Sequence, residues 1–179
     1  MQLGLGMKGD YAVRAVLELA RHYGQRRSKS REIAEQMSIP ERYLPQILAG
    51  LVRHGILAAS AGPDGGYALT RPPRDISLFE VVEAAEGPLT GDKCMLRGGR
   101  CEWTNMCPLH LPWTRAQQAF VEELQSTTFA ELSSLDAAIT AGDPAMTETP
   151  GHRGQRARPV DNDEAAKLPS ARGRARSSE

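Results

Sequence analysis

The sequence has no apolar run near the roughly 18 residues that a membrane-spanning helix needs. Its amino terminus also lacks the charged, apolar and small-residue sections that follow one another in a secretory signal peptide. These two absences exclude a membrane-embedded protein and predict a cytoplasmic location. Reducing conditions there keep cysteines as thiols, which argues against a disulfide framework.

Aromatic residues are scarce, at 5% of the chain, and none lies between residues 141 and 179. That segment holds four Pro, four Gly, seven basic and six acidic residues, so it cannot bury enough apolar surface to offset the cost of ordering its backbone. We therefore expect residues 141–179 to be a disordered tail. The rest of the chain suffices for one domain with a hydrophobic core, or for a small domain with an extension.

The chain has no net charge, because 22 basic residues balance 22 acidic ones. The balance is uneven along the chain: residues 1–76 carry 11 Lys or Arg against 7 Asp or Glu, whereas residues 77–140 carry 4 against 9. A basic first half favours a polyanionic partner such as nucleic acid. The sequence also lacks a paired nucleophile and base and a phosphate-binding glycine loop, which argues against an enzyme, including one with an iron–sulfur Lewis acid.

The three cysteines lie in one short stretch that ends in a histidine, C-M-L-R-G-G-R-C-E-W-T-N-M-C-P-L-H. Six residues separate Cys94 from Cys101, five separate Cys101 from Cys107, and two separate Cys107 from His110. The stretch is rich in Gly and charge and poor in aliphatic residues, so a role as small buried hydrophobes does not suit these cysteines. We interpret it as a ligand loop for a metal or a cluster.

The spacing of this loop lacks the tight C-x₂₋₄-C pair from which most structural zinc sites are built. Wider gaps allow a loop to surround an object larger than one ion, and sulfur ligands with one nitrogen or oxygen ligand occur at iron–sulfur clusters. The alternative is a zinc-binding, nucleic-acid-binding protein with a structural CCCH site. The loop has the ligand order of the C-x₈-C-x₅-C-x₃-H finger but misses two of its three spacings.

Residues 7–23 have the periodicity of an amphipathic helix, with Asp10, Arg14, Glu18 and Arg21 on one polar stripe. Asp10 can pair with Arg14 one turn further on, which accounts for it without a ligand role. Two shorter helices follow, the first with Ser30 as its candidate cap. Two short helices across a tight turn are typical of a helix-turn-helix, and a generic helical hairpin is the alternative.

Residues 56–70 alternate into two short strands around A-G-P-D-G-G, which predicts a β-hairpin directly after the recognition helix. A hairpin in this place is a wing, and it favours the helix-turn-helix over the generic hairpin. Its glycines permit close approach to phosphate. The candidate DNA-binding residues of the helices and the wing are Ser30, Arg31, Arg42, Tyr43, Gln46, Gly62, Pro63, Gly65 and Gly66.

Beyond the wing, Ser77 and Glu80 form a predicted capping box that begins a helix. After the cysteine loop, a long helix is predicted over 108–126 and a short one near 128–139. The long helix has an apolar stripe, which favours a homodimer that places two helix-turn-helix units one turn of DNA apart, with packing against the first domain as the alternative. The stripe consists of Trp113, Ala116, Phe120 and Leu124.

We therefore predict a mainly α fold with a small β wing. Residues 1–87 form a winged helix-turn-helix DNA-binding domain, and residues 88–140 form the iron–sulfur loop and the dimerisation helices. Residues 141–179 form the tail. No membrane association is expected.

Several runs then resemble one known family over roughly residues 7–138. They are M-K-G-D-Y-A-V-R-A, Y-L-P-Q-I-L, H-G-I-L-A-A-S-A-G-P-D-G-G-Y, S-L-F-E-V-V-E-A-A-E-G and the three-cysteine loop. The chain resembles the Rrf2 family of winged-helix transcription regulators, in its IscR-like and NsrR-like branches. The resemblance implies a homodimeric repressor of a palindromic double-stranded DNA operator, with an iron–sulfur cluster that senses iron, redox state or nitric oxide.

The resemblance also implies the cluster ligands. Cys94, Cys101 and Cys107 match the three cluster cysteines, and His110 is similar to the fourth ligand of the IscR-like branch, which implies a [2Fe–2S] cluster. Asp10 matches the fourth ligand of the NsrR-like branch, contributed by the other subunit, which implies a [4Fe–4S] cluster. We favour His110, because a ligand within the loop requires no geometry between subunits.

Two departures limit what the family implies about DNA contacts. Pro45 lies inside the predicted recognition helix, where it removes one N–H donor and bends the helix unless it occupies the first turn. Ala61 stands where IscR-like members have an arginine just before the wing Gly-Pro, so one contact of that kind is missing. The operator sequence therefore cannot be copied from a relative.

Overall fold

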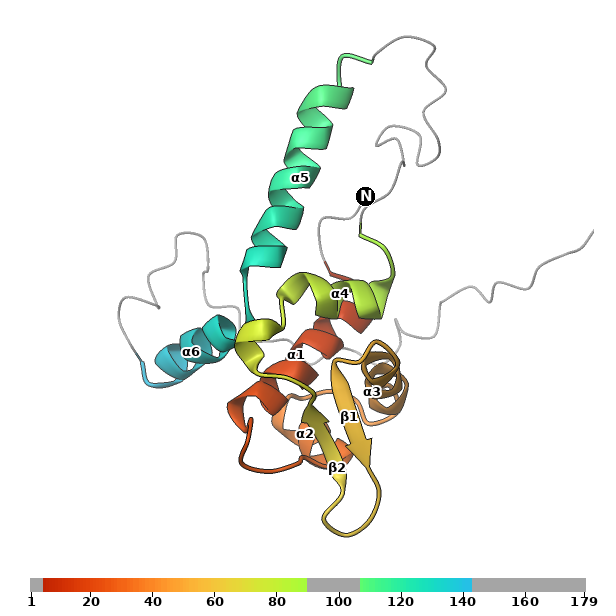
Figure 1. Ribbon diagram of the computed structural model, residues 1–179, viewed down its shortest axis with the longest axis vertical. Helices are drawn as coiled ribbons and strands as arrows, with labels where there is room; N and C mark the ends of the chain where they lie inside the picture. The colour runs from red at the N-terminus through yellow and green to blue at the C-terminus, as the bar shows by residue number, and fades with distance from the viewer. Residues whose placement is uncertain (1–4, 90–106, 143–179) are drawn as a thin grey trace, which may run out of the picture.

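The structure is a computed structural model that describes residues 5–89 and 107–142. The described elements are, in order, α1 (Met7–Arg21), α2 (Ser30–Gln36), α3 (Leu44–Arg53), β1 (Leu57–Ser60), β2 (Gly66–Leu69), the 3₁₀ helix η1 (Pro73–Asp75), α4 (Leu78–Glu86), α5 (His110–Ser126) and α6 (Phe129–Thr140). The β1–β2 hairpin and α5 project from opposite ends of the helical core (Figure 1). The predicted fold class, mainly α with a small β wing, is confirmed.

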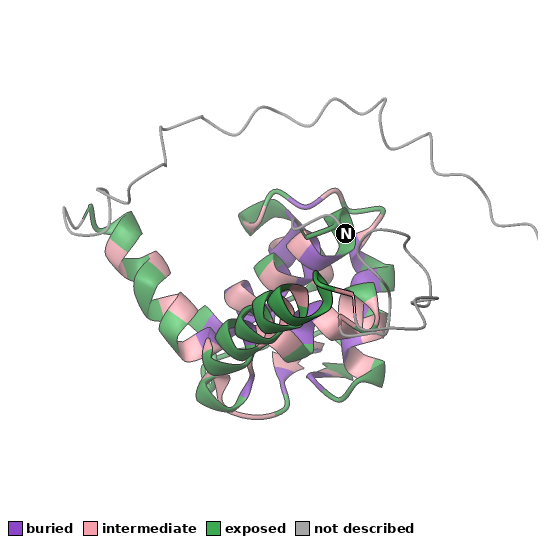
Figure 2. Ribbon diagram, turned by 90° about the horizontal axis from the view of Figure 1, so that it is seen from above, coloured by how far each residue is buried: buried purple, intermediate pink, exposed green. Residues whose placement is uncertain are grey.

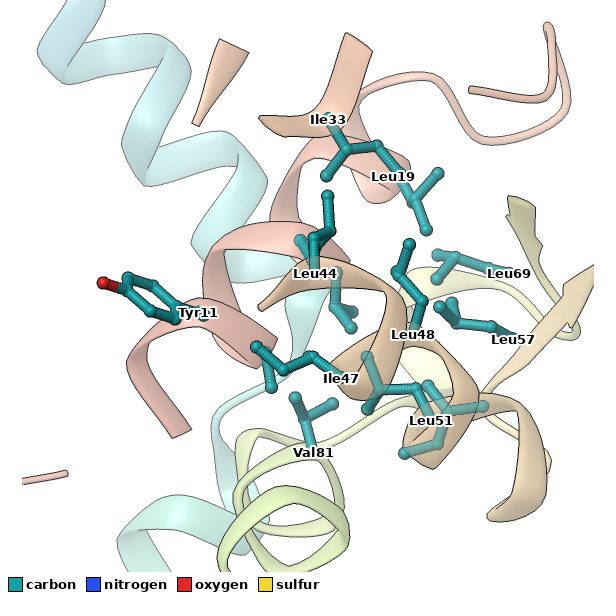
Figure 3. Close-up of a cluster of buried hydrophobic side chains, with 14 of the residues drawn as sticks. Tyr11, Leu19, Ile33, Leu44, Ile47, Leu48, Leu51, Leu57, Leu69 and Val81 are labelled. Atoms are coloured by element: carbon teal, nitrogen blue, oxygen red, sulfur yellow. The ribbon is translucent and has the colours of Figure 1, made fainter. Parts of the chain in front are cut away.

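Helix α1 is the centre of the core, because α2, α3, α4 and α6 all pack against it. Its Ala12, Ala15 and Val16 are fully buried, and small side chains allow the neighbouring helices to approach closely. Leucine and isoleucine side chains from α2, α3 and the hairpin meet those of α1 in one cluster (Figure 3). The polar stripe predicted on α1 is wrong for Glu18, which is only 2% exposed because α1 is covered on most sides.

The helix-turn-helix consists of α2 and α3, and its helix starts differ from the prediction in one respect. Ser30 is not the cap of α2: Lys29 is the capping position, and its N–H donates to the Glu32 carboxylate at 3.0 Å. Pro45 lies in the first turn of α3, where a missing N–H has no helical partner to lose. The helix therefore accommodates Pro45 without a bend.

The wing is an antiparallel hairpin in which Leu57 pairs with Leu69 and Ser60 pairs with Gly66. A third segment pairs with it, since Ser28 and Tyr67 exchange two backbone hydrogen bonds of 3.0 and 2.9 Å. This contact fixes the wing to the segment that enters α2. A single paired residue has no periodicity, so the sequence did not predict it.

The carboxyl end of α5 is attached to the start of α4. Two backbone hydrogen bonds join them, from Leu78 to the Thr127 carbonyl at 2.8 Å and from Phe129 to the Ile76 carbonyl at 3.0 Å. The predicted capping box of Ser77 is confirmed, and Thr128 caps α6 in the same way. Because Phe129 is fully buried, α6 anchors this junction in the core.

Helix α5 begins at His110 and is exposed along most of its length (Figure 2). Leu124 is buried at the junction with α4, whereas Phe120 is 39% exposed and Trp113 is half-buried. Packing against the first domain therefore accounts for one end of the stripe only, and the homodimer stays a prediction. The predicted domain boundaries also stay predictions, and the tail from residue 143 lies outside the described residues.

Candidate DNA interface and cluster loop

The amino end of α3 presents three of the predicted DNA-binding side chains. Arg42 and Gln46 are exposed, and Tyr43 is half-buried. The Tyr43 ring stacks on Tyr11 of α1 with 6.1 Å between centroids, and the Arg42 guanidinium carbon lies 4.7 Å from the centre of the Tyr43 ring. Tyr43 thus holds Arg42 by a cation–π contact while α1 holds Tyr43. Sequence reasoning missed Tyr11, because nothing local marks it as a partner of Tyr43.

Helix α2 presents Arg31, which is 79% exposed, beside the half-buried Ser30. A hydrogen bond from Arg31 to Glu35, at 3.0 Å, raises the pKa of the guanidinium, and the charges of Glu35 and Glu41 add to the rise. The Arg31 guanidinium is a cation, as arginine is throughout proteins, and Glu35 holds it in place. An exposed cation on a long side chain is suited to a phosphate contact.

The wing glycines divide into two kinds. A Cβ added at Gly65 would collide with the Ser60 carbonyl oxygen, and one added at Gly66 would lie 2.7 Å from the Ser28 carbonyl oxygen. The chain's own backbone therefore requires both glycines. Gly62 has a φ of +106° with open space around its Cβ position, and Pro63 beside it is exposed. The candidate contacts with DNA in the wing are thus concentrated at Gly62 and Pro63.

Helix α3 packs against β1, so the recognition helix and the wing lie side by side (Figure 1). Exposed side chains at the start of α3, an exposed arginine on α2 and an open hairpin tip are the parts with which a winged helix contacts DNA. The fold and these residues define a winged-helix DNA-binding protein.

The cysteine loop meets the described structure at Cys107 and His110. The His110 N–H donates to the Cys107 carbonyl oxygen at 2.9 Å, which places the two residues on one turn at the amino end of α5. The Cys107 thiol is free and half-buried, and His110 is exposed. Cys94 and Cys101 lie outside the described residues, and within residues 5–89 and 107–142 no three His, Cys, Asp or Glu side chains are grouped for a metal.

Asp10, the alternative fourth ligand, is engaged by its own helix. Arg14 binds both of its carboxylate oxygens, through Nε at 3.0 Å and Nη2 at 2.9 Å. The predicted pairing of Asp10 with Arg14 is confirmed. A second carboxylate lies close to the start of α1, where the Gly9 N–H donates to Glu86 Oε1 at 2.7 Å.

Comparison with known proteins agrees with this class. Residues 5–134 match the Rrf2 family model, described as an iron-dependent transcriptional regulator. The chain is 32% identical to the HTH-type transcriptional regulator IscR of Sodalis glossinidius over 145 residues, which cover 81% of this chain and 87% of that protein. It is 31% identical to IscR of Erwinia tasmaniensis over 128 residues, which cover 72% of this chain and 77% of that protein.

Two solved structures have a similar fold. The structure of CymR, described as the global cysteine regulator of B. subtilis, matches 74% of this chain and 98% of its own, with a TM-score of 0.66 and 27% identity. That of T. potens IscR matches 78% of this chain and 92% of its own, with a TM-score of 0.63 and 29% identity. The chain belongs to the Rrf2 family and is a DNA-binding transcription regulator rather than an enzyme. Within the described residues, no helix is long and apolar enough to cross a membrane.

Proposed function

We propose that this regulator is a homodimeric repressor whose DNA binding is controlled by an iron–sulfur cluster on Cys94, Cys101, Cys107 and His110. The observation that carries the proposal is the position of α5. Its amino end holds Cys107 and His110, and its carboxyl end is bonded to α4 of the DNA-binding half. A change in ligation at one end of a rigid helix is therefore connected to the DNA-binding half at the other.

The donor set fits a cluster. A thiol and an imidazole lie on one turn of helix, and the positive end of the helix dipole favours anionic thiolates there. Within the described part of the chain the His110 ring makes no hydrogen bond or ion pair, whereas Asp10 is bound by Arg14 through both oxygens. This difference favours His110, and with it a [2Fe–2S] cluster. A [4Fe–4S] cluster with Asp10 requires the Arg14 ion pair to open.

When bound, the cluster supplies a redox-sensitive cross-link between the cysteine loop and α5. Without it, the three thiolates repel one another and take up protons, so their loop relaxes. The signal would be iron, redox state or nitric oxide.

The DNA-binding side of the proposal rests on the exposed residues of α2, α3 and the wing tip. Gln46 is exposed in the first turn of α3 and would read a base edge, and the exposed Arg31 and Arg42 would meet phosphates. A homodimer through the exposed stripe of α5 would present two such units to a palindromic operator, with half-sites about 34–36 Å apart. Trp113 and Phe120 would be buried in that contact.

Anaerobic purification followed by absorption spectra and iron and sulfide analysis tests this proposal. We expect a brown protein with equal iron and sulfide. A colourless, zinc-loaded protein would instead support a structural CCCH site. The fourth ligand is tested by comparing His110→Ala with Asp10→Ala, and we expect the histidine variant to lose or oxidise its cluster sooner. The reverse order would assign the ligand to Asp10.

A further inference from the structure

Among the described residues, Glu18 is the one charged side chain that is buried. Its Oε2 accepts a hydrogen bond from Arg21 Nη1 at 3.2 Å, and its Oε1 lies 3.1 Å from His22 Nε2. An isolated buried carboxylate is strongly unfavourable, so Glu18 depends on these partners. No predicted ligand or DNA contact explains why a carboxylate is kept at this position.

The partners of Glu18 lead away from α1 in two directions. On one side, Arg21 donates through Nε to Asp136 of α6 at 2.8 Å, and its Nη2 lies 2.6 Å from the same oxygen. On the other side, Arg26 lies 4.0 Å from Glu18 and donates to Glu32 of α2 at 3.0 Å. Alternating charges therefore run from α6 across α1 to α2. We call this set of residues the charge chain: Asp136, Arg21, Glu18, Arg26 and Glu32.

The two ends of the charge chain lie in different functional units, α6 at one end and the helix-turn-helix at the other. Helix α6 follows α5 after two residues, Thr127 and Thr128, and is anchored in the core by Phe129. At the other end, Glu32 also accepts the Lys29 N–H at the start of α2, the first helix of the helix-turn-helix. The charge chain thus connects the proposed dimerisation unit to the DNA-reading unit.

We propose that Glu18 and Arg21 are positioning residues that fix the angle between the helix-turn-helix and α5–α6, and thereby the half-site spacing that the dimer accepts. The proposal rests on the homodimer proposed above. A guanidinium holding two carboxylates is directional, because its N–H groups point in a fixed plane. With Arg21 shared between Glu18 and Asp136, α6 cannot turn about α1 without breaking one of the two contacts.

Half-site spacing is a sensitive measure of this angle. With about 10–10.5 base pairs per turn, one inserted base pair rotates a half-site by roughly 35° and moves it by about 3.4 Å. A rigid dimer can bind both half-sites at either the original spacing or the spacing with one inserted base pair, but not at both. A dimer with a loosened α1–α6 contact can bind at both spacings. It binds the original spacing more weakly than the rigid dimer does, because α6 must then be fixed relative to α1 on binding, at a cost in entropy.

The test uses the full-length protein and two DNA duplexes. The first is a palindromic duplex that the wild-type protein selects from a random pool, and the second is the same duplex with one base pair inserted at its centre. Asp136→Ala removes the α6 end of the charge chain and leaves Glu18 paired. Asp136→Glu retains the carboxylate, and Asp75→Ala is a control that removes a carboxylate paired only weakly, at 3.9 Å, with Arg74.

We expect three proteins to bind the inserted duplex at least about 30-fold more weakly than the selected duplex: the wild-type protein, Asp136→Glu and Asp75→Ala. For Asp136→Ala we expect the same ratio to be no more than about 5-fold. The difference is of the size typical of coupling between two sites. A purely structural role would lower both affinities of Asp136→Ala in the same proportion, and an unchanged ratio would overturn the proposal. A wild-type protein that selects no palindrome would instead refute the proposed dimeric function.

Discussion

The replacement Phe129→Ala tests whether α6 anchors α5 to the DNA-binding half. Phe129 is fully buried in the same cluster as α1, and its N–H is bonded to Ile76. Removing a buried phenyl ring loses its transfer free energy and leaves a cavity, at a cost of about 3–5 kcal/mol. Since a domain is stable by only about 5–15 kcal/mol, this loss would bring the protein close to unfolding at 37 °C.

Urea unfolding followed by far-ultraviolet circular dichroism measures the change, at one fixed protein concentration low enough for light scattering to show monomers. The matched control is Phe120→Ala, the same truncation at a side chain that is 39% exposed on α5. We expect Phe120→Ala to lower the free energy of unfolding of the monomer by less than about 1 kcal/mol. At higher protein concentration, light scattering should show that this variant dimerises more weakly than the wild-type protein. If Phe129→Ala costs no more than Phe120→Ala, α6 is not an anchor and the connection between α5 and α4 is not as described.

Further outcomes follow from single positions. Gln46→Ala should lose about 1–3 kcal/mol of discrimination between operator bases. Arg42→Ala should instead lower the affinity for all DNA sequences alike and reduce the slope of log affinity against log salt concentration by about one. Unchanged binding in both variants would reject this docking mode. Gly50→Ala should stabilise α3 by about 0.5–1 kcal/mol, because the added Cβ meets only Arg53 at 3.9 Å, but Gly66→Ala, at φ +143° and against the Ser28 carbonyl, should destabilise the wing in thermal melts. Partial burial acts to raise the pKa of Glu80, but the backbone hydrogen bond from Ser77 and the charge of Arg71 hold it below the ordinary 4.5. Its stabilising contribution is thus present above that pH and lost as the pH falls through and below it, so Glu80→Gln should show a smaller loss of Tm than the wild-type protein between about pH 6 and about pH 3.

Features that depend on neighbours in sequence were predictable. The Ser77 capping box and the hairpin around Gly62 and Pro63 each follow from residues within a few positions of one another. For Pro45 the sequence left two alternatives, a bent helix or a place in the first turn, and the structure has the second. Local chemistry decides such elements, because their hydrogen bonds close within one turn of chain. Helix caps were less predictable, as the capping of α2 by Lys29 and not by Ser30 shows.

Features that depend on tertiary contacts were not predictable from local pattern. Glu18 lies at helical spacing with Asp10 and Arg14 and was expected on the polar stripe, yet the packing of α6 and the arginines around it bury it. The pairing of Ser28 with Tyr67 joins segments almost 40 residues apart through one residue each. Cys107 and His110 were predicted as ligands from the spacing of the cysteines. The structure adds their position at the start of α5, the helix whose other end is bonded to α4.

Operator affinity measured with and without the cluster is the direct test of whether the cluster controls DNA binding. The selected duplex is titrated anaerobically with the wild-type holoprotein, with the same protein after iron removal, and with Cys107→Ala, while light scattering confirms that all remain dimers. We expect the iron-free protein and Cys107→Ala to bind alike, and both to differ from the holoprotein by at least about tenfold, within the range typical of coupled sites. Equal affinity in all three preparations would contradict control of DNA binding by a cluster.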